Sequence, residues 1–331
     1  MGEKIGRLIG AAAGTTVVAD STSVNLFKLL AAALNMRPGR AVILTEDGNF
    51  PTDLYVAQGL AALLQRGHVL RQAADVMSAL DNTVAVLMLT HANYRSGAMH
   101  PMAALTRAAH AAGALVLWDL SHSAGAVPLQ LDADSVDFAV GCGYKYLNGG
   151  PGAPAFLFVA KHLQDDLRLP LTGWLGHAAP FAFESRYRPA AGVARAVVGT
   201  PPILSLAALE VGVDIALEAP VAAVRTKSLR LAELFIALME PEGTFRLLTP
   251  RQPAARGSQV AFAHPDGYAI VQAMIERGVI GDFRAPDVLR FGLTPLYVRY
   301  VDVWDTVAVL RDVMRSEAWR DPKFQDRRSV T

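Results

Sequence analysis

The sequence predicts an α/β protein with a mostly parallel sheet sandwiched by helices, followed by a smaller C-terminal α+β domain. Short runs rich in Val, Leu and Ala alternate with helical patterns over the first two-thirds of the chain. Continuous apolar strands separated by helices are typical of a parallel sheet that is covered on both faces. The length of 331 residues is sufficient for about two domains.

The expected elements follow in chain order. Strands are expected at residues 41–45, 84–89, 114–120, 138–141 and 155–160. The helices between them are expected at residues 23–34, 51–65 and 101–112. A helical pattern that begins at residue 204 continues towards residue 240, and strand-like segments follow it at 259–263 and 288–293. We therefore expect a large domain over residues 1–215 and a small domain over residues 216–331, with the boundary inside one long helix.

Composition excludes several classes of protein. A formal net charge of +1 gives no electrostatic reason to bind nucleic acid or an anionic membrane surface. The single cysteine, Cys142, excludes an internal disulfide and fits a reducing compartment. No apolar run approaches the ~20 residues that span a bilayer, and the eight histidines are too scattered for a metal site. We expect a cytoplasmic protein with no metal, no nucleic-acid partner and no membrane partner.

A lysine stands where one expected strand ends, and ligands of open α/β sheets bind at the carboxyl ends of strands. Lys145 follows that apolar strand and precedes a glycine-rich turn, in Gly143-Tyr-Lys-Tyr-Leu-Asn-Gly-Gly150. A lysine at a pocket edge can form a Schiff base when a nearby cation lowers its pKa. A solvated loop lysine would show the same pattern, so Lys145 alone decides nothing.

A second polar group ends another expected strand, 26 residues before the lysine, in Trp118-Asp-Leu-Ser-His122. Asp119 is suited to hold a pyridinium nitrogen protonated, which makes the ring an electron sink. His122 is suited to support that carboxylate or to pack over the ring. Taken singly, Asp119 could be an ordinary helix cap or turn residue and His122 an ordinary interior histidine. The combination of strand, Asp119 and His122 with a second strand and Lys145 at this spacing is a much more specific pattern than either half.

Two helix starts complete the set. The segment Asp20-Ser-Thr-Ser-Val-Asn25 opens a helix, and its hydroxyls and free N–H groups suit a cofactor phosphate. The segment Asn49-Phe-Pro-Thr-Asp53 follows a strand; its Phe50 can stack on a planar ring, while Thr52 and Asp53 direct polar atoms towards it. Ordinary helix capping explains either segment in isolation.

These motifs together resemble the cofactor core of the kynureninases. The segments that carry the resemblance are Asn49-Phe-Pro-Thr-Asp53, Trp118-Asp-Leu-Ser-His-Ser-Ala-Gly125, Gly143-Tyr-Lys-Tyr-Leu-Asn-Gly-Gly150, Gly173-Trp-Leu-Gly-His177, Gly199-Thr-Pro-Pro-Ile203 and Leu289-Arg-Phe-Gly-Leu-Thr-Pro-Leu-Tyr297. The resemblance implies the fold-type I architecture of PLP-dependent transferases, within the class V aminotransferase-like superfamily. It also implies pyridoxal 5′-phosphate (PLP) as cofactor and a homodimer with shared active sites.

The implied reaction is the hydrolysis of a carbon–carbon bond in tryptophan catabolism. L-kynurenine, or its 3-hydroxy form, would yield L-alanine and anthranilate or 3-hydroxyanthranilate. The resemblance implies that Lys145 is the Schiff-base lysine and that Asp119 pairs with the pyridine nitrogen, supported by His122. It implies that Phe50 stacks on the ring and that Arg290 clamps the substrate carboxylate, a task suited to a planar bidentate donor.

Further contacts with the cofactor are implied for polar residues around it. These residues are Thr22, Ser23, Thr52, Asp53, Thr90, Tyr144, Trp174 and Thr200. Trp174 and Thr200 match positions that reach the phosphate from the partner subunit, and Tyr144 is the candidate proton shuttle. Asp53, close to the ring, joins Lys145, Tyr144 and Asp119 as a candidate catalytic residue.

Two other functions stay open. Relatives normally carry a further N-terminal segment that contributes to the substrate pocket, whereas this sequence starts just before the phosphate-binding helix. A truncated paralogue that binds PLP without turnover is therefore one alternative. The other is a class V aminotransferase or a protein like the cysteine desulfurases, although a desulfurase needs a cysteine well after the lysine and Cys142 precedes it. The preference between kynurenine and 3-hydroxykynurenine also stays open.

Overall fold

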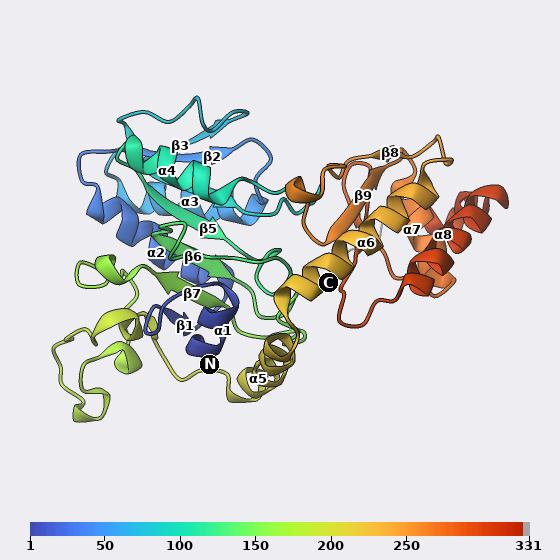
Figure 1. Cartoon of the computed structure of the whole chain (residues 1–331). Coiled ribbons are helices and arrows are strands. Elements are labelled where there is room, and N and C mark those ends of the chain that lie inside the picture. Colours follow the sequence, from blue (N-terminus) through green and yellow to red (C-terminus); the bar gives the residue numbers. More distant parts are fainter. Residues whose placement is uncertain (327–331) are drawn as a thin grey trace. The chain divides into compact units, whose positions relative to one another are not determined.

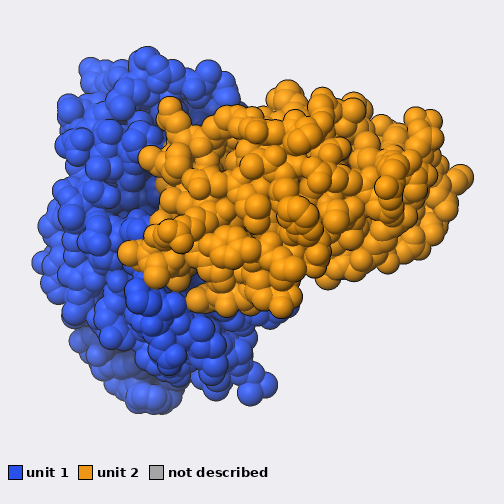
Figure 2. All heavy atoms as spheres, turned by 45° about the vertical axis from the view of Figure 1, so that its right-hand side comes forward, with its two compact units in different colours: residues 1–91, 100–221 blue, residues 92–99, 222–331 orange. Residues whose placement is uncertain are grey.

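The computed structural model describes residues 1–326 as two compact units. Unit 1 consists of residues 1–91 and 100–221, and unit 2 consists of residues 92–99 together with the described chain from residue 222 onwards (Figure 2). The predicted domain boundary at residue 215 stays a prediction. Every helix within residues 1–326 is too short or too polar to cross a bilayer.

Unit 1 is built around a seven-stranded sheet (Figure 1). In spatial order the strands are β1 (Thr16–Val18), β7 (Phe156–Val159), β6 (Phe138–Gly141), β5 (Leu115–Asp119), β4 (Val84–Thr90), β2 (Val42–Glu46) and β3 (Val69–Ala73). The strands from β6 to β3 pair in parallel, whereas β7 is antiparallel to both of its neighbours. No crossover helix lies between β6 and β7, and a direct return of this kind gives an antiparallel pair. The prediction of a mostly parallel α/β sheet is confirmed.

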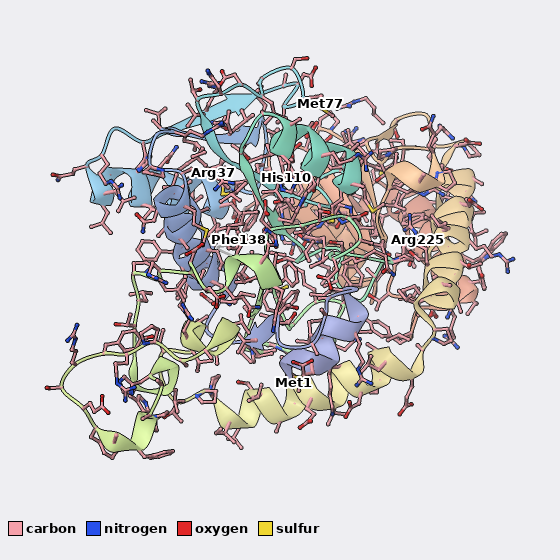
Figure 3. The ribbon with its side chains drawn as sticks, turned by 60° about the vertical axis from the view of Figure 1, so that its left-hand side comes forward. Met1, Arg37, Met77, His110, Phe138 and Arg225 are labelled. Carbon is pink, nitrogen blue, oxygen red and sulfur yellow. The ribbon has the colours of Figure 1, made fainter. Side chains whose placement is uncertain are left out.

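Helices cover both faces of this sheet. They are α2 (Thr22–Met36), α3 (Pro51–Leu64) and α4 (Met102–Ala111), and they match the predicted helices closely. Side chains alternate along β5, so Leu117 lies in the hydrophobic core that also contains Leu29 of α2 and Phe138 of β6. Trp118 points the other way, where its Nε1 donates to Thr106 Oγ1 of α4 at 3.3 Å. Figure 3 labels Phe138 within unit 1.

Two further helices of unit 1, α1 (Gly2–Leu8) and α5 (Ile203–Glu218), pack against each other. Lys4 Nζ of α1 donates to Glu210 and Asp214 of α5, at 2.8 and 2.9 Å. The first residues of the chain are thereby attached to the last helix of the unit.

Unit 2 is an α+β unit around a four-stranded antiparallel sheet. In spatial order the strands are β10 (Asp282–Arg284), β11 (Val288–Gly292), β9 (Gln259–Ala263) and β8 (Arg246–Leu247). The helices are α6 (Val221–Met239), α7 (Gly267–Glu276) and α8 (Tyr300–Arg315). Residues 92–99 belong to this unit, since Gln259 Nε2 donates to the carbonyls of Asn93 and Tyr94, each at 3.1 Å.

The prediction of one long helix from residue 204 towards residue 240 is wrong. Helix α5 ends at Glu218 and α6 begins at Val221. Pro220 stands at the break, and proline lacks the N–H that a continuous helix requires. Strands β1 and β3 were not predicted, because β1 is three residues long and β3 is a partly exposed edge strand without a continuous apolar run.

A fully buried lysine connects three segments of unit 1 through an ion pair and a hydrogen bond. Lys28 of α2 forms an ion pair with Asp20, which precedes the helix, and its Nζ also donates to the carbonyl of Ala196 at 2.7 Å. Asp20 has a φ of 47°, a left-handed conformation that is uncommon outside glycine. Lys28 therefore fixes the turn from which α2 begins.

Substitution Lys28→Met should lower the free energy of unfolding by about 2–4 kcal/mol, because it leaves Asp20 and the carbonyl of Ala196 without their donor. Urea denaturation followed by circular dichroism measures the loss. Lys227→Met is the matched control, because Lys227 Nζ also donates from a helix to a carbonyl, that of Pro295, but is only partly buried. A loss no larger than that of the control would contradict a structural role for the buried lysine.

Candidate active site

The candidate site lies where the parallel strands of unit 1 end. Thr90 ends β4 and Asp119 ends β5, and the two residues are paired in register. Asn49 follows β2, and Lys145 follows β6. The carboxyl ends of adjacent parallel strands meet at one edge of a sheet, so the topology gathers residues that are far apart in the sequence.

Asp119 is a buried acid in a fixed position. Its Oδ1 accepts a hydrogen bond from the backbone N–H of Ser121 at 2.8 Å, and its carbonyl accepts one from the N–H of His91 at 2.9 Å. Burial raises the pKa of the carboxyl, while the charge of Lys145 and the bonds from Ser121 act in the opposite direction. The result is a rigid carboxyl whose charge depends on a cation beside it.

Lys145 is presented by a turn that closes on itself. The N–H of Gly149 donates to the carbonyl of Gly143 at 2.9 Å. A Cβ on Gly143 would lie 2.3 Å from the carbonyl oxygen of Pro154, so only glycine allows this close approach of two backbone segments. Lys145 Nζ lies 5.5 Å from the centre of the Tyr144 ring.

Tyr144 and Cys142 lie beside the lysine. Partial burial, followed by the influence of Cys142 and Asp119, raises the pKa of Tyr144 to about 12. Cys142 Sγ lies 3.7 Å from the carbonyl oxygen of Ser121, and burial raises the pKa of its thiol. A buried thiol with a raised pKa is a poor nucleophile, and Cys142 acts as packing behind the site.

In the sequence Asn49 stands out only as part of a motif, but in the structure its side chain forms hydrogen bonds with three residues of the site. Its Nδ2 donates to Thr45 Oγ1 at 2.8 Å. Its Oδ1 accepts from Thr90 Oγ1 at 2.6 Å and from the N–H of Phe50 at 2.7 Å. One buried amide therefore connects the ends of β2 and β4 to the start of α3. A lone asparagine before a helix gives no sequence signal that would distinguish this role from capping.

Asp53 is the second buried acid of the site. It lies in the first turn of α3, with Oδ2 3.4 Å from Thr90 Oγ1. Burial raises the pKa of its carboxyl well above the ordinary value, and repulsion by Asp119 raises it further. A hydrogen bond donated by the Thr90 hydroxyl would lower this pKa, and the charge of Lys145 also lowers it. Two acids and one ammonium thus interact within a single cluster.

The predicted phosphate-binding residues open α2. Ser21 caps the helix, its Oγ accepting from the N–H of Val24 at 3.3 Å, and Thr22 and Ser23 occupy the partly exposed first turn. Thr52 is likewise partly buried in the first turn of α3, and His122 lies in the turn after β5.

Trp174 and Thr200 are exposed on the loops between β7 and α5. The Trp174 ring packs edge-on against Phe181, with 5.6 Å between the ring centres. The two loops run close together, because a Cβ on Gly173 would lie 2.0 Å from the carbonyl oxygen of Val198.

Arg290 belongs to unit 2, where it lies on β11. Its guanidinium forms an ion pair with Asp282 and donates to the carbonyl of Tyr94. Asp282 is shared, since Arg284 Nη1 lies 2.9 Å from its other oxygen. The guanidinium of Arg290 is thus oriented by Asp282 and by the carbonyl of Tyr94 within unit 2. Unit 1 separately brings together Lys145, Tyr144, Asp119, Asp53 and Thr90.

The residues of unit 1 fit PLP by their chemistry. A buried carboxyl suits the pyridine nitrogen, a lysine amine suits the aldehyde, and a helix N-terminus with hydroxyls suits the phosphate. Phe50, which caps α3 and is partly exposed, offers an aromatic face.

The buried acids give a pH-dependent prediction. A carboxyl whose pKa is raised on folding stabilises the folded chain in its protonated form, and this contribution is lost as the pH rises through the folded pKa. Asp53→Asn cannot ionise, so in cofactor-free protein its melting temperature should exceed that of the unsubstituted chain increasingly as the pH rises from about 4 to about 7. A gain on the order of 1 kcal/mol corresponds to about 2–4 °C. A difference that shrinks with rising pH would contradict the raised pKa.

Comparison with solved structures identifies the fold of the chain. A cysteine desulfurase from Thermococcus onnurineus NA1 has a TM-score of 0.80 at 18% identity, over 95% of this chain and 82% of that chain. A C-DES mutant solved with glycine covalently linked to its PLP cofactor has a TM-score of 0.80 at 19% identity, over 94% of this chain and 84% of that chain. These similarities confirm the fold-type I prediction.

Sequence comparison is more specific. The family model of the kynureninase C-terminal domain matches residues 224–310. The kynureninase of Pseudomonas fluorescens is 50% identical over all of this chain and 82% of its own length. A kynureninase of Burkholderia pseudomallei is 52% identical over the same shares. The chain therefore belongs to the kynureninase family of PLP-dependent enzymes.

Proposed function

We propose that this chain hydrolyses L-kynurenine, or its 3-hydroxy form, to L-alanine and the corresponding anthranilate. The observation that carries the proposal is the cluster of Lys145 and Asp119, which follow or end strands, with Asp53 in the first turn of α3. The whole chain is also 50% identical to a kynureninase. The buried acids and the lysine are the groups that this reaction needs for holding a pyridine ring and moving protons.

Each part of the cofactor has a candidate partner in the chain. Bound PLP supplies an electron sink for the bonds at the substrate's α-carbon. Asp119 would hold the proton of the pyridine nitrogen, with His122 in support, and Phe50 would pack on the ring face. Thr22 and Ser23 would bind the phosphate through hydroxyls and helix N–H groups, and the remaining contacts would come from Thr52, Thr90, Tyr144, Trp174 and Thr200.

Proton transfers fall to two neighbouring side chains. Lys145 Nζ would take the α-proton of the substrate, since it lies at the strand end beside both acids. A tyrosine with an ordinary pKa near 10 is already protonated at neutral pH, and the pKa of Tyr144 is raised further, to about 12. Tyr144 would therefore act as a donor rather than as a base. Arg290, already oriented by Asp282 and the carbonyl of Tyr94, would bind the substrate carboxylate with its guanidinium fork.

A homodimer completes the proposal. Unit 1 exposes large apolar side chains on the loops and helix after β7, among them Phe181, Phe183 and Leu204, the last with 89% of its surface exposed. Exposed apolar groups in one region are typical of a subunit interface. Trp174 and Thr200 lie on the same loops, which would place them within reach of a partner's phosphate. The single cysteine, which is buried, supports a cytoplasmic location.

Substitution Lys145→Ala tests the reaction. Removing the amine should lower anthranilate release from L-kynurenine by about 10⁴-fold or more, because both covalent capture of the cofactor and α-proton transfer are lost. Anthranilate fluorescence measures product release by both proteins. In the unsubstituted chain, borohydride reduction followed by peptide mass spectrometry locates the lysine to which the cofactor is attached. Attachment at Lys145 without anthranilate would instead favour a non-hydrolytic PLP protein, and a transaminated product would favour the aminotransferase alternative.

Hybrid dimers test the shared site. Lys145→Ala and Trp174→Ala chains, each nearly inactive alone, should form hybrids that contain one intact site when the two are unfolded and refolded together. Random pairing makes half of the dimers hybrid, so about a quarter of the unsubstituted activity should return. Sedimentation analysis checks that both chains dimerise. Recovery no greater than the sum of the two separate variants would show that Trp174 does not serve a partner's site.

A further inference from the structure

We propose that Asn49 is a positioning residue that engages the single hydroxyl proton of Thr90 and thereby keeps Asp53 as a neutral carboxylic acid. This inference deepens the proposed function, because it names the protonation state in which one of its acids begins the reaction. It concerns the cofactor-free chain and does not require turnover.

The hydrogen-bond directions around Asn49 follow from chemistry alone. The N–H of Phe50 donates to Asn49 Oδ1 at 2.7 Å, which identifies that atom as the amide oxygen. The amide nitrogen then donates to Thr45 Oγ1 at 2.8 Å. An amide oxygen cannot donate, so the 2.6 Å contact between Asn49 Oδ1 and Thr90 Oγ1 takes the proton of the Thr90 hydroxyl.

The orientation of Thr90 decides what Asp53 can do. A hydroxyl has one proton and two lone pairs. With its proton directed at Asn49, Thr90 offers only lone pairs to Asp53 Oδ2 at 3.4 Å. A carboxylate would meet a lone pair there and be repelled, whereas a neutral carboxylic acid can donate its own proton. The arrangement therefore favours the protonated form of Asp53.

The charged groups around Asp53 agree with this assignment. Asp119, from β5, repels a negative charge on Asp53, and Lys145, after β6, attracts one. Burial raises the pKa of both carboxyls, and that of Asp53 is raised well above its ordinary value. One ammonium and two acids are balanced when Asp119 carries the charge and Asp53 carries the proton. Asp53 would then start the catalytic cycle as a proton donor.

Infrared titration of cofactor-free protein tests the assignment. The carbonyl stretch of a neutral carboxylic acid is resolved from that of carboxylates, and subtraction of the Asp53→Asn spectrum isolates the band of Asp53. We expect this band to persist well above the pH at which ordinary aspartates ionise, near 4. Its absence at neutral pH in folded protein would overturn the proposal.

Two variants distinguish the hydrogen-bond directions. Thr90→Val removes the acceptor of the Asp53 proton, so the pH at which half of the band is lost should move to a lower value. Movement to a higher pH would show that Thr90 donates to a carboxylate, and this result would contradict the proposal. Asn49→Ala frees the Thr90 proton to stabilise the carboxylate, which should also lower the midpoint, and no movement would contradict the role of Asn49. Circular dichroism checks folding, and the nearly isosteric Thr90→Val decides the matter if Asn49→Ala does not fold.

Asn93→Ala is the matched control. Asn93 Oδ1 likewise accepts backbone hydrogen bonds, from the N–H groups of Arg95 and Ser96, but in unit 2. The Asp53 band should keep its midpoint in this variant, and an equal shift would mean that the effect is not specific to Asn49. Because no substrate is present, a confirmed band with absent turnover would count against the proposed function alone.

Discussion

The site depends on the electrostatic interaction of two buried acids with one lysine. Asp53 and Asp119 are both buried, and burial disfavours the charged form of each. Lys145 can compensate for one negative charge fully but not for two. The remaining features of the site follow from this imbalance: Ser121 stabilises charge on Asp119, while Asn49 and Thr90 arrange hydrogen bonds around Asp53 that suit a proton. The fold thus differentiates two chemically identical side chains by their surroundings.

This differentiation requires precise placement, which the parallel sheet supplies. Asp119 and Thr90 end adjacent strands in register, and Asn49 bridges to the next strand through Thr45. Strand ends are rigid because their backbone groups are bonded within the sheet. Unit 2 orients its own candidate residue in the same manner, since Arg290 lies within a strand and is held by Asp282. Groups that must bind without rearranging are placed on regular structure.

Much of the fold could be predicted, because its strongest signals are local. The apolar runs that became β2, β4, β5, β6 and β7 are continuous and bounded by turn residues. The break at Pro220 was missed because apolar periodicity continues across it, although proline itself signals a boundary. The edge strand β3 was missed because its exposed residues carry no apolar pattern. Lys145 and Asp119 stood out because each directly follows an apolar strand.

The roles of Asn49 and Lys28 could not be predicted, because they arise from tertiary contacts. Lys28 is the one charged residue of the mostly apolar helix α2, and it is fully buried beside Asp20. Asn49 can bond to both Thr45 and Thr90 only because β2 and β4 lie side by side in the sheet. Sequence patterns report the period of an element and the identity of a terminal residue, but not the partner that another strand brings.

The turn that carries Lys145 has a consequence for how such enzymes diverge. Its shape is fixed by a glycine that lies against the backbone of the segment before β7 and by a hydrogen bond between Gly149 and Gly143, and not by bonds of the lysine side chain. Whatever residue occupies position 145 would be displayed at the same point in space. A cysteine there, alkylated to a lysine-like thioether amine, would carry its nitrogen along nearly the same path. The turn therefore sets the position of the reactive group, and the side chain at position 145 can be replaced without altering the surrounding backbone.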